Sequence, residues 1–85
     1  MPSIPPDPVI ARRVEIGDQL RLARFSAGLT QEQLALRCGL DRPSVVRIEK
    51  GQQDPHLSTL IRIEGVIGAR LTLSVDGDSE VNGRQ

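Results

Sequence analysis

Basic and hydroxyl side chains gather in one short stretch, residues 41–50, which reads DRPSVVRIEK. Guanidinium groups such as those of Arg42 and Arg47 donate paired hydrogen bonds to guanine edges or clamp phosphate oxygens. If the stretch is a helix, its outer face presents Arg42, Pro43, Val46, Arg47 and Lys50. The alternative is that both arginines are solvated surface residues. The helical motif around them favours contact with nucleic acid.

Other chemistry finds little support among the reactive residues. Cys38, the single cysteine, falls on an inward helix face beside a turn, which favours a buried apolar residue over a redox or metal role. His56, the single histidine, has no acid, serine or thiol placed to make it a catalyst; we expect an exposed cap or loop residue, with a phosphate contact as the alternative. With no nucleophile and base pair, no carboxylate dyad and no metal-ligand spacing, we expect neither an enzyme nor a cofactor or metal.

A short helix followed by a glycine turn precedes the basic stretch. Thr30 can cap this helix while Gln33 reaches back to it, the reciprocal arrangement of a capping box. Leu34 and Cys38 recur one turn apart on the buried face. Gly39 follows where the chain must reverse, since glycine takes a left-handed conformation without steric cost.

The basic stretch itself has the features of a second helix. Asp41 is a plausible cap, Pro43 is tolerated in the first turn, and Val45 and Ile48 face inward three residues apart. Gly51 ends the helix. Residues 30–51 therefore predict a helix-turn-helix whose second helix has the outer face of a recognition helix for a major groove.

Length and composition set the limits of the fold. A chain of 85 residues holds one small domain with a marginal core, for which dimerisation is the natural supplement. One cysteine excludes an internal disulfide and favours the cytoplasm. No apolar run approaches the roughly 20 residues that cross a bilayer, and the amino terminus lacks the hydrophobic segment of a signal peptide, so no membrane partner is expected.

Charge is distributed unevenly along a chain whose formal net charge is zero. Residues 12–50 hold eight basic and five acidic residues, a net charge of +3, whereas the last ten residues carry a net charge of −2. The surplus on the helix-turn-helix is modest. We therefore expect its sequence-independent affinity for DNA to be weak and salt-dependent.

The elements around the motif complete an all-α fold. Residues 1–8, with four prolines, predict a flexible arm, and residues 9–68 the helix-turn-helix domain. Its first helix should run from about Val9 or Ala11 to Ala27, and its fourth over about Leu57 to Ile67. The inward residues of these two helices are expected to be Ile16, Leu20, Ala23, Ala27, Leu60, Ile63 and Ile67.

The period changes to an alternating one over residues 69–75. Apolar Leu71, Leu73 and Val75 alternate with polar residues, which predicts a strand. A lone strand needs a partner for its backbone groups, and nothing else in the chain predicts one, so we expect the same strand of a second copy. The three apolar residues would form the interface of a homodimer, and residues 76–85 a disordered tail.

Leu22 and Phe25 lie nearly opposite the core stripe of the first helix. An exposed apolar pair of this kind usually marks an interface with a partner protein or a second copy. The alternative is that the proline-rich arm or the carboxyl-terminal strand covers it within the same protomer.

The motifs together resemble a known family. They are G-L-T-Q-x-x-L-A at residues 28–35, Gly39-Leu40, R-I-E-x-G at residues 47–51, then Pro55 and Leu60. Over roughly residues 16–67 the chain resembles the Cro and phage-repressor (XRE-like) helix-turn-helix regulators, which implies a lambda-repressor-like four-helix fold and double-stranded DNA as the partner. Residues 68–75 resemble the HipB-like antitoxin that partners the HipA kinase toxin.

The resemblance also implies roles for single residues. Gln31 matches the family glutamine that holds a DNA phosphate, and Arg24 with Glu49 matches an ion pair that ties the first helix to the recognition helix. Pro43 and Val46 depart from the family, which has polar or small residues there; Val46 would offer a methyl contact to thymine. The DNA-binding set expected is Gln31, Asp41, Arg42, Pro43, Ser44, Val46, Arg47 and Lys50.

We therefore expect a sequence-specific transcriptional repressor that binds an inverted-repeat operator as a homodimer. Its two recognition helices would lie about 34 Å apart. The alternative is an antitoxin that neutralises a HipA-like toxin protein by direct binding and uses DNA binding for autoregulation.

Overall fold

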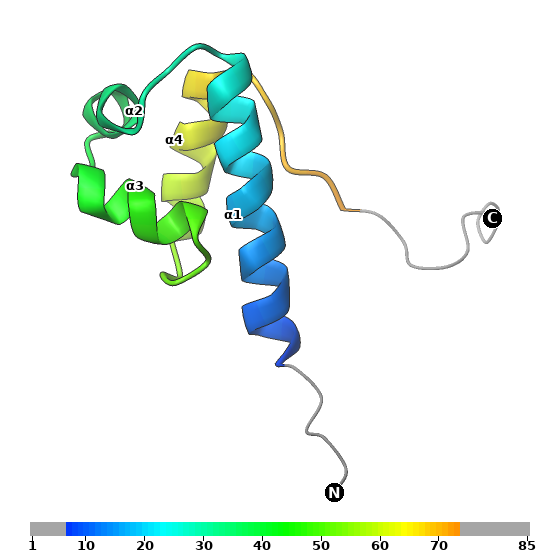
Figure 1. The fold of residues 1–85 in the computed structure, drawn as a ribbon. Coiled ribbons are helices and arrows are strands. Elements are labelled where there is room, and N and C mark those ends of the chain that lie inside the picture. Colours follow the sequence, from blue (N-terminus) through cyan, green and yellow to red (C-terminus); the bar gives the residue numbers. More distant parts are fainter. Residues whose placement is uncertain (1–6, 74–85) are drawn as a thin grey trace, which may run out of the picture.

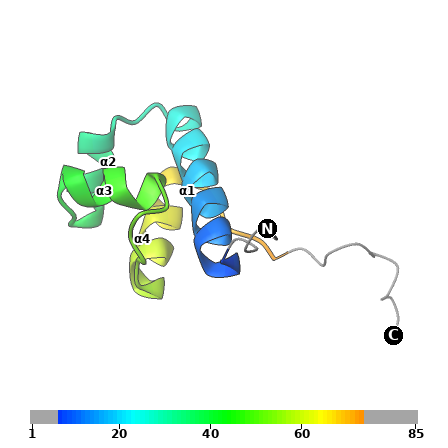
Figure 2. The ribbon, with the colours of Figure 1, turned by 60° about the horizontal axis from the view of Figure 1, so that its bottom comes forward.

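Four α-helices make up the described part of the chain, as the sequence predicted. The computed structural model describes residues 7–73. The helices are α1 (Pro8–Ser26), α2 (Gln31–Cys38), α3 (Arg42–Glu49) and α4 (Leu57–Ile67). Figures 1 and 2 show α2 and α3 together on one side of α1, with α3 lying across the direction of α1.

Helix α1 begins earlier and ends earlier than the sequence suggested. The Asp7 carboxylate accepts a hydrogen bond from the Val9 N–H at 2.8 Å, and Pro8 takes the first helical position, where its fixed φ fits. Pro8 thus belongs to the helix and not to the expected arm, whose residues 1–6 lie outside the described residues. Ala27 was wrongly expected in the core: it is exposed because the helix ends at Ser26 and Ala27 forms the cap.

The ends of α2 and the start of α3 confirm the capping predictions. The Thr30 hydroxyl accepts from the Gln33 N–H at 3.0 Å, and the Gln33 amide oxygen accepts from the Thr30 N–H at 2.9 Å. Gly39 ends α2 in the left-handed region at φ 70°. The Asp41 carboxylate then accepts from the Ser44 N–H at 2.9 Å and starts α3. The helix-turn-helix is therefore present as predicted.

One apolar core joins all four helices. Leu34, Val45 and Ile63, which come from α2, α3 and α4, are its most deeply buried side chains. Half-buried Leu40 packs against it from the turn. The buried members are Leu20, Leu29, Leu34, Ala35, Cys38, Val45, Ile48, Ile63 and Ile67.

A glycine lets α1 approach the carboxyl end of α3 closely. A Cβ atom on Gly17 would lie 2.5 Å from the carbonyl oxygens of both Ile48 and Glu49, far inside normal contact. Only glycine leaves room for these backbone groups at this point. The position of α3 on α1 is thus set in part by the absence of one side chain.

The chain after α4 runs without a strand as far as the described residues extend. Residues 69–73 make no sheet pairing within the single chain, so the expected strand is not shown, and Val75 with the expected tail at 76–85 lies outside the described residues. Leu71, Leu73 and Val75 were expected to form the interface of a homodimer. Within the single chain, Leu71 is half-buried against its own core, whereas Leu73 is 98% exposed.

None of the helices in residues 7–73 combines the length and the apolar character needed to span a membrane.

Candidate nucleic-acid interface

The outer face of α3 presents the basic side chains that the sequence singled out. Val45, Ile48 and Glu49 hold the inner face, all buried. Because these three are fixed, the opposite side chains project from a rigid helix. Across the expected DNA-binding set, Asp41, Arg42, Pro43, Arg47 and Lys50 are exposed, and Gln31, Ser44 and Val46 are half-buried.

Arg47 has an orienting partner that the sequence did not reveal. Its Nε donates to the Gln53 side-chain oxygen at 3.0 Å, from the loop that follows α3. The terminal guanidinium nitrogens remain for a bidentate contact, so the hydrogen bond aims the group without using its fork. No spacing in the sequence pointed to Gln53, because the contact depends on how the loop folds back.

Asp41 acts here as a cap. Hydrogen bonds from the Ser44 side chain and backbone N–H hold the pKa of Asp41 below its ordinary value, and the charge of Arg47 lowers it further. The Asp41 carboxylate therefore fixes the start of α3.

A buried ion pair joins α1 to α3. Arg24 Nε lies 2.7 Å from Glu49 Oε2 and Arg24 NH2 lies 3.1 Å from Glu49 Oε1, a two-pronged contact between residues that are 5% and 7% exposed. The third nitrogen, NH1, donates to the Leu29 carbonyl at 2.8 Å. The pair expected from the family resemblance therefore exists as a clamp with nearly every polar atom partnered.

Gln31 is attached to the same clamp. Its Nε2 donates to Glu49 Oε1 at 3.2 Å, which ties the first residue of α2 to the last residue of α3. One N–H of the amide remains free of this bond. Gln31 is half-buried at the amino end of α2, the positive end of the helix dipole.

Phe25 borders the same surface. The residue is 59% exposed, and the centre of its ring lies 4.7 Å from the Arg24 guanidinium carbon. Phe25 also lines a surface depression together with Gln31 and Arg42. Phe25 is thus adjacent to the candidate interface. Leu22, the other half of the expected partner surface, is exposed on α1 as well.

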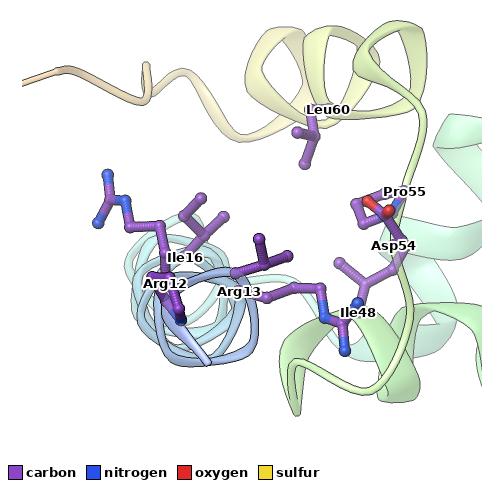
Figure 3. Close-up of a pocket in the computed structure, with 9 residues that line it drawn as sticks. Arg12, Arg13, Ile16, Ile48, Asp54, Pro55 and Leu60 are labelled. Atoms are coloured by element: carbon purple, nitrogen blue, oxygen red, sulfur yellow. The ribbon is translucent and has the colours of Figure 1, made fainter. Parts of the chain in front are cut away.

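A separate apolar pocket of about 370 Å³ lies between the amino ends of α1 and α4 (Figure 3). Ile16 and Leu60 face each other across it. Ile48 of α3 and Pro55 of the loop before α4 line another side of the pocket. Charged groups come from Arg12, Arg13 and Asp54, and the residues that line the pocket include no serine, cysteine or histidine. Its lining does not provide a nucleophile with a base.

The remaining reactive residues hold the positions expected of them. Cys38 is buried, and this burial raises the pKa of its thiol despite the opposing charge of Arg62. His56 is exposed at the start of α4 and makes no side-chain cap. Within residues 7–73 there is no cluster of three or more histidine, cysteine or acidic side chains that could hold a metal ion.

Comparison with known proteins agrees with this geometry. An HTH-type transcriptional regulator of Haemophilus influenzae is 36% identical over 61 residues, which are 72% of this chain and 62% of that protein. The immunity repressor protein of Bacillus phage phi105 is 30% identical over 70 residues, which are 82% of this chain and 49% of the repressor. Among solved structures, the restriction-modification controller protein C.AhdI of Aeromonas hydrophila is similar with a TM-score of 0.71 at 33% identity, covering 75% of this chain and 93% of the controller.

The sequence of residues 20–73 matches the family described as Helix-turn-helix, and this range contains the capped α2, the glycine turn and α3. The chain belongs to this XRE-type helix-turn-helix family, whose members are DNA-binding transcription regulators and not enzymes.

Proposed function

We propose that the protein is a cytoplasmic repressor that binds an inverted-repeat operator as a homodimer and reads it with α3. The observation that carries this proposal is the exposed arginine face of α3, held in place by the Arg24–Glu49 clamp. The similarity to a phage immunity repressor supports repression as the outcome of binding.

Within this interface Arg42 and Arg47 would read base edges, and Lys50 would bind phosphate as a point charge. Gln31 would hold a phosphate at the start of α2. Ser44, Pro43 and Val46 would lie against the groove, with Val46 facing thymine methyl groups.

An operator selected from random duplexes gives the test. In gel-shift titrations we expect Arg42→Ala and Arg47→Ala each to weaken operator binding by roughly 30-fold or more, since a bidentate base contact is worth about 1 to 3 kcal/mol and the homodimer loses one in each half-site. Arg62→Ala, which removes an exposed arginine of α4, is the matched control and should leave the affinity unchanged. Unchanged binding in an Arg42 and Arg47 double variant would reject α3 as the reading helix.

Gln31→Ala should behave differently. A phosphate contact positions the protein without reading sequence, so the affinity should fall by the same factor on operator and on scrambled DNA. A loss confined to the operator would show that Gln31 contacts a base instead.

The homodimer rests on the alternating pattern of residues 69–75 and on Leu73, which has almost no contact with its own protomer. We propose that Leu73 and Val75 pair with the same residues of a second copy. A chain ended after Thr72 keeps Leu71 and its contacts but loses this edge. Sedimentation equilibrium should show a monomer; an intact dimer would reject the strand interface and direct attention to Leu22 and Phe25.

A toxin-binding role remains supported only by the resemblance of residues 68–75 to the HipB-like antitoxins. Affinity purification from the native host tests it. A kinase of the HipA type that co-purifies in stoichiometric amount would establish this role beside repression.

A further inference from the structure

Glu64 holds the segment that leaves α4 by three backbone contacts. Its carbonyl oxygen accepts from the Gly68 N–H at 2.9 Å and from the Ala69 N–H at 3.3 Å. Its side-chain Oε2 accepts from the Leu71 N–H at 2.7 Å, seven residues along the chain. The last bond is charge-assisted and part-buried, and it turns the chain back over the helix it has just left.

The Leu71 side chain completes this attachment. It lines a small recess with Leu20 and Ala23 of α1 and Ile67 of α4, and it is half-buried there. Arg70 and Thr72 on either side are exposed. The attachment therefore ends at Leu71, and the chain beyond it reaches Leu73 without further burial.

The attachment is linked to the recognition helix through packed elements. Helix α4 packs on α2, and α2 packs on α3. Since these helices share one core, a segment fixed on α4 is also fixed relative to the arginine face of α3. A segment attached only through Gly68 would instead behave as a flexible tether, which keeps two copies together without setting their relative orientation.

We infer that Glu64 is a positioning residue that sets the half-site spacing the repressor accepts, by fixing the direction in which residues 72 and 73 leave each protomer. This inference rests on the proposed homodimer. With the attachment intact, the two α3 helices hold one separation and rotation, and only an operator with matching spacing engages both. Without it, the dimer adapts to several spacings and binds none of them as tightly.

A panel of duplexes tests this, each carrying the selected inverted repeat with the central spacer shortened or lengthened by one or two base pairs. Each added base pair rotates one half-site by about a tenth of a turn. We expect the full-length protein to favour one spacing by about tenfold or more, and Glu64→Ala to reduce that preference to about threefold or less. Glu64→Gln keeps an oxygen acceptor without the charge and should retain an intermediate preference.

Two further variants separate this role from a general loss of structure. Glu15→Ala removes an exposed carboxylate of α1 that makes no contact with residues 68–73, and it should keep the full preference. Leu71→Ala leaves Glu64 intact but removes the side chain that seats the segment, so it should lose the preference as Glu64→Ala does. Circular dichroism of each variant reports whether the four helices remain.

Sedimentation equilibrium distinguishes a failure of the inference from a failure of the proposed function. A dimeric, helical Glu64→Ala or Leu71→Ala variant that keeps the parent spacing preference would overturn the inference alone. A monomeric parent protein, or one that binds an isolated half-site as tightly as the repeat, would overturn the proposed homodimer and the inference with it.

Discussion

A methyl group added at Gly17 should displace α3. The Cβ of Gly17→Ala would lie 2.5 Å from the carbonyl oxygens of Ile48 and Glu49, about 0.9 Å inside the ordinary contact limit. Both obstacles are backbone, so α1 and the end of α3 must separate. Overpacking of this kind typically costs about 1 to 3 kcal/mol or more, against roughly 1 kcal/mol gained when alanine replaces glycine in a helix.

The chain offers a matched control for this change. Gly65 also lies within a helix, and a Cβ atom there would meet nothing within 4 Å. The same substitution at Gly65 should therefore stabilise the protein by roughly 0.5 to 1 kcal/mol through the helix preference alone. The two variants are expected to move the free energy of unfolding in opposite directions.

Thermal and urea unfolding measure the effect, and gel shift measures its consequence. At roughly 4 to 8 °C per kcal/mol for a domain of this size, Gly17→Ala should melt several degrees below the parent and Gly65→Ala a few degrees above it. Operator affinity of folded Gly17→Ala should also fall, since the end of α3 carries Arg47. A Gly17→Ala protein at least as stable as the parent, with full operator affinity, would refute the argument from close approach.

Three further outcomes are expected. Arg24→Ala and Glu49→Ala should each lower the free energy of unfolding by about 3 kcal/mol, because each leaves a buried charge without its partner. Urea unfolding of the double variant should show a loss well short of the sum of the two single losses. Strictly additive losses would contradict the clamp. The pKa of Asp41 is lowered in the folded protein, so its contribution to stability is complete above the ordinary pKa of 3.8 and is lost as the pH falls through the lower folded pKa. Asp41→Asn should therefore weaken the dependence of stability on pH in the acid range, which urea unfolding at a series of pH values measures. Cys38, buried and with a raised thiol pKa, should resist alkylation at neutral pH until urea unfolds the chain, which mass spectrometry of the labelled protein would detect.

Most of the fold could be predicted from local patterns in the sequence. The sequence alone was enough to predict the caps and the turn, because each depends on residues no more than three positions apart. They are the capping box at Thr30 and Gln33, the turn at Gly39 and the cap at Asp41. The start of α1 was missed although Asp7-Pro8 is a local signal, because the run of prolines before it favoured an extended arm.

Two contacts that depend on the path of the chain escaped prediction for a physical reason. The space at Gly17 is filled by carbonyl groups more than 30 residues along the chain, and nothing in the residues around Gly17 indicates them. The bond from Leu71 to Glu64 likewise required the path of the chain after α4. The alternation of residues 69–75 predicted a strand, but it could not show that Leu71 packs against the core of its own protomer.

Because the helix-turn-helix has only a small surplus of positive charge, tight operator binding should depend mainly on how its contacts with DNA are arranged. A specific complex in the usual range of 10⁻⁸ to 10⁻¹¹ M needs roughly 11 to 15 kcal/mol, whereas each base contact of one α3 supplies about 1 to 3 kcal/mol. A net charge of +3 over residues 12–50 adds little phosphate attraction to that sum. In the proposed homodimer, α3 of the second copy must therefore be presented at the right place, so that its contacts form without a further loss of translational freedom. For this reason the attachment of Glu64 to Leu71 should matter more to operator binding here than it would in a strongly basic domain.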